Sequence, residues 1–157
     1  MKLSKGLNKA IENVMGVNGA ETRNIRVVIA DDNKEMREAV IALLEGTPGF
    51  EVVGAVGDGR ALVTAVTELA PDIGIVDISM PIMNGILAAT EIKRLGSGIK
   101  MIFLTVNEDC DFVRAAFETG ASGYVIKRQM ATDLSIAIDE TLAGRTFVSA
   151  GCEIAEA

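Results

Sequence analysis

The sequence of 157 residues has no histidine and only two cysteines. Without histidine, the chain cannot use Ser/His/Asp or Cys/His catalysis, cannot offer imidazole to a metal, and cannot carry a phosphohistidine of its own. Cys110 and Cys152 lack the CxxC or Cys/His spacing of a zinc site or a redox pair. We therefore expect both thiols to be reduced, as in the cytosol.

Positive charge and long apolar runs are also scarce. The net charge is −7, from 22 acidic and 15 basic residues, and the basic pairs at 93–94 and 127–128 do not form a stripe that would follow a nucleic-acid backbone. No apolar run reaches the roughly 18 residues that span a bilayer, and the N-terminal stretch lacks the apolar region of a signal peptide. These absences predict a soluble cytoplasmic protein that binds neither nucleic acid nor membrane directly.

The chain length fits one domain, because a chain of about 150 residues buries roughly 68–70% of its unfolded surface without a metal or disulfide. We expect this domain over residues 25–145, preceded by an extension at 1–24 and followed by a surface tail or linker at 146–157. In the extension, apolar residues recur every three or four positions, with lysines on the other faces: Leu3, Leu7, Ile11 and Val14. This spacing predicts a short amphipathic helix, which is either a frayed leader or a helix that docks on a partner or on this chain.

From residue 25 onward, short apolar runs alternate with stretches of helical periodicity. The runs occupy residues 25–30, 50–56, 73–76, 100–106 and 123–126, and each is followed by apolar residues at helical spacing. Five such units in about 120 residues predict an α/β fold, a doubly wound five-stranded parallel sheet with helices on both faces.

Polar residues stand where four of these runs end: Asp31, Asp32, Asp77, Thr105 and Lys127. Parallel strands bring their carboxyl ends to one edge of a sheet, so these side chains are expected to share a cleft. Clustered carboxylates repel one another and normally hold a cation, and all-oxygen ligands favour Mg²⁺. Such an inventory suits transfer of a phosphoryl group to an aspartate, with a lysine and a threonine beside the phosphoryl oxygens.

Each residue also has an ordinary structural interpretation when it is taken alone. Asp77 could begin a turn or cap a helix, Lys127 could be a surface lysine, and Thr105 could be a strand residue chosen for its branched side chain. Tyr124 could be a half-buried aromatic residue of the sheet. The joint occurrence at matching strand ends favours the functional interpretation.

Over residues 25–145 the sequence resembles the receiver domains of two-component response regulators. The resemblance is carried by ADD at 30–32, D-x-x-x-P-x-x-x-G at 77–85, Thr105 and Lys127. It implies a flavodoxin-like strand order 2-1-3-4-5. The ending A-G-R-T-F-V-S at 143–149 is most similar to receivers that precede a C-terminal helix-turn-helix DNA-binding domain, so the chain would be either an excised receiver or a regulator without that output.

The resemblance also implies roles for single residues. Asp77 would be the phosphoacceptor, Asp32 a direct Mg²⁺ ligand and Asp31 a water-mediated one, with Asp77 and the Ser79 backbone carbonyl completing the metal site. Lys127 would bind the phosphate, and Thr105 and Tyr124 would form the switch pair. Such a domain is not an enzyme in the usual sense, although it assists its own phosphorylation and dephosphorylation.

The partners implied are a sensor histidine kinase or a phosphotransfer protein, with self-association on phosphorylation, and the process is transcriptional signalling. Two alternatives remain open. One is a phosphorylation-independent pseudo-receiver that acts as an interaction module. The other is a small flavodoxin-like protein or phosphatase, against which the sequence lacks a Gly-rich phosphate loop after its first strand and a D-x-D motif.

Two positions depart from the family pattern. Arg128 stands where many receivers have a proline that aims the lysine through a cis peptide bond, so the direction of Lys127 is open. Val106 is bulkier than the small residue common after the switch threonine. We expect Val106 to rim the phosphate cleft together with Ser79 and Asn107, and to slow the loss of phosphate.

Overall fold

The computed structural model describes residues 23–151 as a parallel sheet with helices packed on both faces. The strands are β1 (Ile25–Ala30), β2 (Phe50–Val56), β3 (Ile73–Val76), β4 (Lys100–Thr105), β5 (Gly123–Ile126) and β6 (Phe147–Val148). The helices are α2 (Lys34–Glu45), α3 (Gly59–Leu69), α4 (Gly85–Arg94), α5 (Cys110–Glu118) and α6 (Met130–Leu142), with a short 3₁₀ helix, η1 (Lys127–Gln129), before α6. The predicted N-terminal helix lies outside the described residues.

The strand order is β2-β1-β3-β4-β5-β6, and every neighbouring pair is parallel. This confirms the predicted fold class and the order 2-1-3-4-5. In register, Ala30 of β1 lies beside Val76 of β3, and Thr105 of β4 lies beside Ile126 of β5. The residues that follow these positions therefore emerge together at the carboxyl edge of the sheet.

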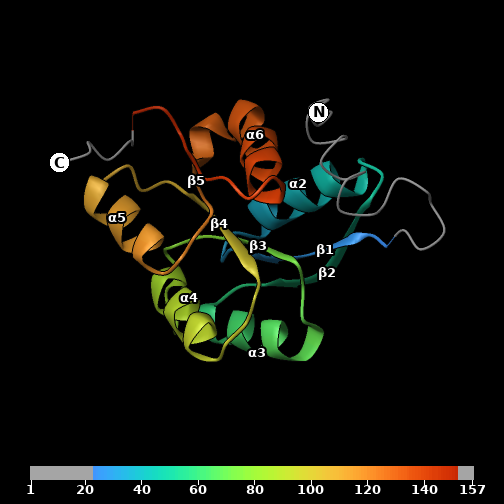
Figure 1. Ribbon diagram of the computed structural model, residues 1–157, viewed down its shortest axis with the longest axis horizontal. Coiled ribbons are helices and arrows are strands. Elements are labelled where there is room, and N and C mark those ends of the chain that lie inside the picture. Colours follow the sequence, from blue (N-terminus) through green and yellow to red (C-terminus); the bar gives the residue numbers. More distant parts are fainter. Residues whose placement is uncertain (1–22, 152–157) are drawn as a thin grey trace.

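Helices cover both faces of the sheet (Figure 1), and an apolar core lies between the helices and the sheet on each face. Helices α3, α4 and α5 cover one face, where Phe103 and Tyr124 are fully buried. Helices α2 and α6 cover the other, where Leu44 and Leu134 are fully buried. Burying one such side chain contributes about 1.5–3 kcal/mol, so the apolar positions predicted from the sequence account for how the helices dock.

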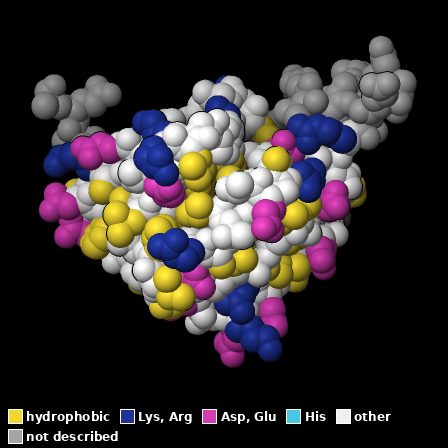
Figure 2. Space-filling model, turned by 90° about the horizontal axis from the view of Figure 1, so that it is seen from below, with side chains coloured by type: hydrophobic (Ala, Val, Ile, Leu, Met, Phe, Trp, Pro, Cys, Tyr) yellow, Lys and Arg dark blue, Asp and Glu magenta, His cyan; other side chains and the backbone are white. Residues whose placement is uncertain are grey.

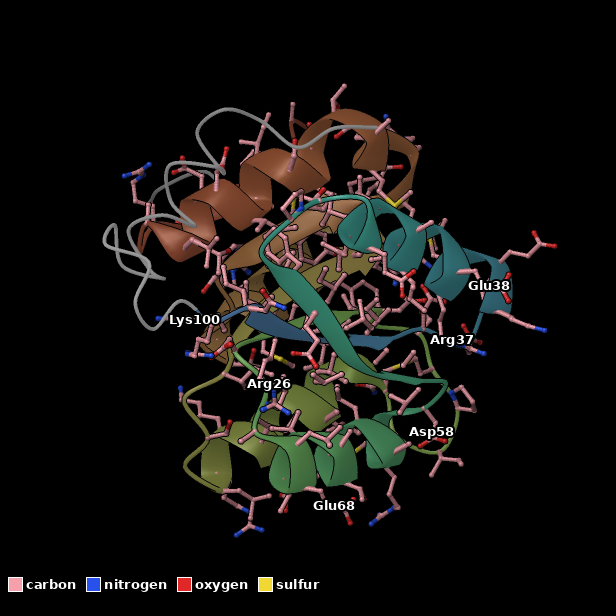
Figure 3. The ribbon with its side chains drawn as sticks, turned by 90° about the vertical axis from the view of Figure 1, so that its right-hand side faces the viewer. Arg26, Arg37, Glu38, Asp58, Glu68 and Lys100 are labelled. Carbon is pink, nitrogen blue, oxygen red and sulfur yellow. The ribbon has the colours of Figure 1, made fainter. Side chains whose placement is uncertain are left out.

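Four helices begin near the carboxyl edge with a polar cap. The side-chain oxygens of Asn33, Asp58, Asn84 and Asp109 each accept a hydrogen bond from a backbone N–H in the first turn of α2, α3, α4 and α5. Figure 3 shows Asp58 and Arg37 on one side of the molecule and Lys100, at the start of β4, on the opposite side. The caps thus fix the helix starts around the edge where the polar strand-end residues gather.

Strand β6 lies within residues 146–157, where the sequence predicts only a surface tail or linker. Its residues pair with β5, Gly123 with Phe147 and Tyr124 with Val148. Next to the strand, the buried Ser149 accepts a hydrogen bond from the Ile126 N–H (3.1 Å) and donates one to Asp133 Oδ2 (2.7 Å). A strand of two residues is too short to show a period in the sequence.

The outer surface of α3 and α4 carries apolar and charged side chains of both signs, interspersed (Figure 2). Within residues 23–151, no helix has both the length and the apolar character required to cross a membrane.

Candidate functional site

The site begins with Asp31 and Asp32, which follow β1 directly. Asp31 is buried, with 3% of its surface exposed, and its Oδ1 accepts a hydrogen bond from the Asn33 N–H (2.8 Å). Its backbone oxygen accepts a hydrogen bond from Arg37 on α2 (2.7 Å). Asp32 is exposed. The turn therefore holds one carboxylate rigidly inside the domain and leaves the other facing solvent.

Asp77 follows β3, and its N–H donates to the Ala30 carbonyl at 2.8 Å, which extends the pairing of β1 and β3 by one residue. Its side chain is almost fully buried. Gly85 lies directly behind it, where a Cβ atom would come within 2.1 Å of the Asp77 carbonyl oxygen. Only glycine allows this close approach, which explains the glycine of the D-x-x-x-P-x-x-x-G pattern in physical terms.

Lys127 joins the two buried carboxylates. Its Nζ lies 2.7 Å from Asp31 Oδ2 and 3.0 Å from Asp77 Oδ2. No peptide bond within residues 23–151 is cis, and the lysine reaches the carboxylates with Arg128 after it. The direction of Lys127, which the sequence left open, is toward Asp31 and Asp77.

Arg128 itself points to the neighbouring loop, where its guanidinium forms hydrogen bonds and an ion pair with Glu108. Both side chains are about half exposed, so the pair contributes little to stability, typically 0–1 kcal/mol. It does connect the turn after β5 to the loop after β4. No local signal in the sequence predicts this pair, because its residues lie 20 positions apart.

Thr105 and Asn107 form the third side of the site. Thr105 is fully buried, and its hydroxyl oxygen accepts hydrogen bonds from the backbone N–H (3.3 Å) and the side-chain amide (3.1 Å) of Asn107. The same amide also donates to Ser79 Oγ (3.3 Å). Asn107 thus connects the loop after β3 with the loop after β4, a role that its predicted place at the rim of the cleft does not include. Val106 is 66% exposed beside them.

Tyr124 is more buried than the sequence suggested. Its ring belongs to the core on the face of the sheet that α3, α4 and α5 cover, and its hydroxyl donates to the Asn107 backbone carbonyl at 2.7 Å. The loop that contacts the Thr105 hydroxyl through its amide therefore contacts Tyr124 through its carbonyl.

The pKa values of Asp77 and Lys127 are both raised at this site. Burial raises the pKa of Asp77 above its ordinary value, although Lys127 and Thr105 oppose this, and the charge of Asp31 raises it further. Burial by itself lowers the pKa of Lys127, but the hydrogen bonds to Asp31 and Asp77 raise it on balance. At Asp77, burial outweighs the effects that lower the pKa. At Lys127, the hydrogen bonds and charges of the two aspartates together outweigh burial.

Three carboxylates, from Asp31, Asp32 and Asp77, offer oxygen atoms within 4.8 Å of one another. Two of these carboxylates, Asp31 and Asp77, share the single positive charge of Lys127. The cluster is compact, consists of hard oxygen donors and carries excess negative charge, and the pKa of Asp77 within it is raised. This is the ligand chemistry of a magnesium site. The structure brings five predicted residues to one edge of the sheet: Asp31, Asp32, Asp77, Thr105 and Lys127. Ser79 is linked to Thr105, because the Asn107 amide donates a hydrogen bond to each of their hydroxyl oxygens.

The comparisons with known proteins agree with this arrangement. The family model of the response regulator receiver domain matches residues 27–139. The transcriptional regulatory protein LiaR of Bacillus subtilis is 39% identical over 114 residues, which cover 73% of this chain and 54% of LiaR. The transcriptional regulatory protein DegU of Brevibacillus brevis is 34% identical over 79% of this chain and 52% of its own length. The chain spans about half the length of these relatives.

Solved structures give the same result. A two-component response regulator of the LuxR family from Aurantimonas superposes with a TM-score of 0.76 and 33% identity, covering 81% of this chain and 91% of that one. The isolated REC domain of RcsB from Salmonella enterica, solved with the phosphomimetic BeF₃⁻, has a TM-score of 0.76 and 29% identity over 83% of this chain and 96% of its own. The chain belongs to the response regulator receiver domain family.

Proposed function

We propose that this receiver domain accepts a phosphoryl group on Asp77 from a phosphohistidine of a partner protein and uses it to switch a protein contact in transcriptional signalling. The observation that carries the proposal is the bridge of Lys127 between the buried carboxylates of Asp31 and Asp77. These 157 residues include no histidine, so a phosphohistidine donor lies outside them.

In the proposed reaction an Asp77 carboxylate oxygen attacks the phosphorus of the phosphoimidazole. The new O–P bond forms as the P–N bond breaks, and the imidazole leaves with the electron pair and takes up a proton. The Lys127 ammonium, released from its bond to Asp77, neutralises charge on the phosphoryl oxygens, and the Thr105 hydroxyl donates a hydrogen bond to one of them. Burial raises the pKa of Asp77, and a cation beside the carboxylate opposes this effect and favours the ionised nucleophile.

Asp31, Asp32 and Asp77, with the Ser79 backbone carbonyl, would hold a Mg²⁺ ion. Bound there, the ion would neutralise charge on the phosphoryl oxygens during transfer. The donor set fits this ion, because the carboxylate oxygens lie within 4.8 Å of one another and Asp32 faces solvent, where waters can complete the coordination.

The switch that we propose acts through the Asn107 loop. A phosphoryl group that draws the Thr105 side chain toward it would move the hydroxyl oxygen away from the two Asn107 groups whose hydrogen bonds it accepts. Since the Asn107 carbonyl holds Tyr124, any shift of the loop changes the surface over β5 and α5. The relatives named above are transcriptional regulators, and two dimers of RcsB have been solved on DNA, which supports a role in transcription.

The test is labelling with a small phosphodonor such as phosphoramidate in Mg²⁺, followed by intact mass and electrophoresis that retards phosphoproteins. We expect one phosphoryl group on the wild type and none on Asp77→Asn. Asp111→Asn, a change at an aspartate whose side chain is 88% exposed on α5, should be labelled like the wild type. If the wild type takes no label and beryllofluoride leaves its spectrum unchanged, the domain is an interaction module that works without phosphorylation.

A further inference from the structure

A groove of about 730 Å³ opens at the amino edge of the sheet, opposite the acidic site. It lies between the last turns of α3, α4 and α6 and the first residues of β1, β3 and β4. Its floor and walls are mainly apolar and include Val66, Ile92, Leu95, Ile99 and Leu142. We refer to it as the amino-edge groove. Its volume lies within the range of roughly 300–1,000 Å³ that is typical of sites that bind a ligand.

A buried hydroxyl lines this groove. Thr141, near the end of α6, is 3% exposed, and its Oγ1 has no hydrogen-bond partner among the residues that the structure describes. Buried hydroxyl groups are nearly always bonded to something, because leaving one unpaired costs free energy. An unpaired hydroxyl in the wall of an apolar groove points to an occupant that brings a polar group along with apolar surface.

The chain enters the described domain at the rim of the same groove. Arg23 lines it and binds Asp72 through two hydrogen bonds, at 2.7 and 2.9 Å. Asp72 is held in turn by the N–H of Arg26 (2.8 Å). The residues before Arg23 therefore start from a fixed point beside the groove.

The preceding sequence supplies a matching apolar face. Leu3, Leu7, Ile11 and Val14 recur at helical spacing, and residues 15–22 separate them from Arg23. Those eight residues can extend over about 26 Å at most, and a helix over residues 3–14 would be about 18 Å long. The linker is thus long enough for the segment to turn back, and short enough to keep it close to the groove at a high effective concentration.

We propose that residues 3–14 dock on the amino-edge groove of their own chain, with the four apolar side chains against its walls and a polar group of the segment bonded to Thr141. The segment then covers the ends of α3, α4 and α6. Docking takes place at the edge opposite Asp77, so it leaves the acidic site open to a partner. This inference does not rest on the proposed function.

Cross-linking in the full chain tests the proposal. In a background of Cys110→Ser and Cys152→Ser, Ile11→Cys is combined either with Leu95→Cys or with Leu87→Cys and treated with a short bismaleimide at low protein concentration. The two leucines are matched controls, because both belong to the α4 region and are 51% and 57% exposed, while only Leu95 lines the groove. We expect rapid cross-linking within one chain for the Leu95 pair and several-fold slower cross-linking for the Leu87 pair.

Equal rates for the two pairs would overturn the proposal, and so would cross-linked dimers, which would mean that the groove holds the segment of a second copy. Hydrogen exchange gives an independent measurement. Protection of the amides at 3–14 should be lost in Leu95→Asp and kept in Leu87→Asp, and both surface substitutions should leave the circular dichroism unchanged. Unprotected amides in the wild type, or a small molecule that copurifies in the groove by native mass, would contradict docking of this segment.

Discussion

The hydroxyl of Tyr124 donates a hydrogen bond of 2.7 Å to the backbone carbonyl of Asn107, and the Asn107 side chain in turn donates to the Thr105 hydroxyl. One loop residue therefore connects the only tyrosine of the chain, fully buried in β5, with the polar end of β4. The polar end of β4 and the buried tyrosine of β5 are therefore linked through a single loop residue.

Tyr124→Phe tests this connection, because it removes the hydroxyl and keeps the ring. The Asn107 carbonyl then loses a hydrogen bond, and we expect the free energy of unfolding to fall by about 1–3 kcal/mol. Urea titration followed by circular dichroism measures the change. An unaltered stability would mean that the bond contributes nothing net and that water replaces the hydroxyl.

Asp77→Asn is expected to stabilise the domain in the absence of divalent cations, by about 0.5–2 kcal/mol at pH 7. Burial raises the pKa of Asp77, so the folded domain binds this proton more tightly than the unfolded chain. The wild type therefore gains stability relative to the variant as the pH falls through the raised pKa. Below the ordinary pKa of aspartate, about 3.9, both states are protonated and the difference disappears.

Denaturation in EDTA at several pH values measures this difference. Lys127 also contacts Asp31, at 2.7 Å, so we expect the ammonium to keep a carboxylate partner in the variant. Asp111→Asn, at an exposed position on α5, is the control for a general effect of net charge. A stability gain that persists unchanged into acid would contradict the assignment to Asp77.

Ser149→Ala is expected to destabilise the domain by about 1–3 kcal/mol, because it leaves the buried Ile126 N–H without its acceptor and takes a donor from Asp133. Hydrogen exchange should locate the effect at Ile126, directly before Lys127. Ala150→Ser, at the exposed next position, is a neutral control. If exchange at Ile126 is unchanged in Ser149→Ala, β6 does not support the end of β5.

The sequence predicted the alternation of strands and helices because buried parallel strands are apolar throughout and helices repeat their apolar residues every three or four positions. It also predicted that Asp31, Asp77 and Lys127 meet at one edge, since each stands at the end of such a strand. It could not predict contacts that depend on two distant loops, such as the Asn107 amide between Thr105 and Ser79. The Arg128–Glu108 pair could not be predicted for the same reason. Strand β6 could not be predicted because two residues are too few to show a periodic pattern.

Ile82→Gly should stabilise the domain. Ile82 has a φ of +69°, in the left-handed region, and is 77% exposed in the loop after Asp77. Relief of that conformation gains about 1–2 kcal/mol, while the added freedom of glycine in the unfolded chain costs about 0.4–1 kcal/mol. We expect a net gain of roughly 0.5–1 kcal/mol by urea denaturation. A loss of stability would show that the Ile82 side chain makes contacts that outweigh its backbone strain.

Val106→Ala should accelerate the loss of phosphate from Asp77, if the proposed phosphorylation occurs. The Val106 side chain is 66% exposed next to the buried Thr105, and its neighbour Asn107 is bonded to Ser79 across the site. A smaller side chain there leaves more room for the water that attacks the aspartyl phosphate. The rate of decay of radiolabelled phosphoprotein after removal of the donor measures the effect, with Leu87→Ala on α4 as a control for an exposed apolar residue outside the site. Faster decay in the wild type than in Val106→Ala would show that the valine does not restrict access.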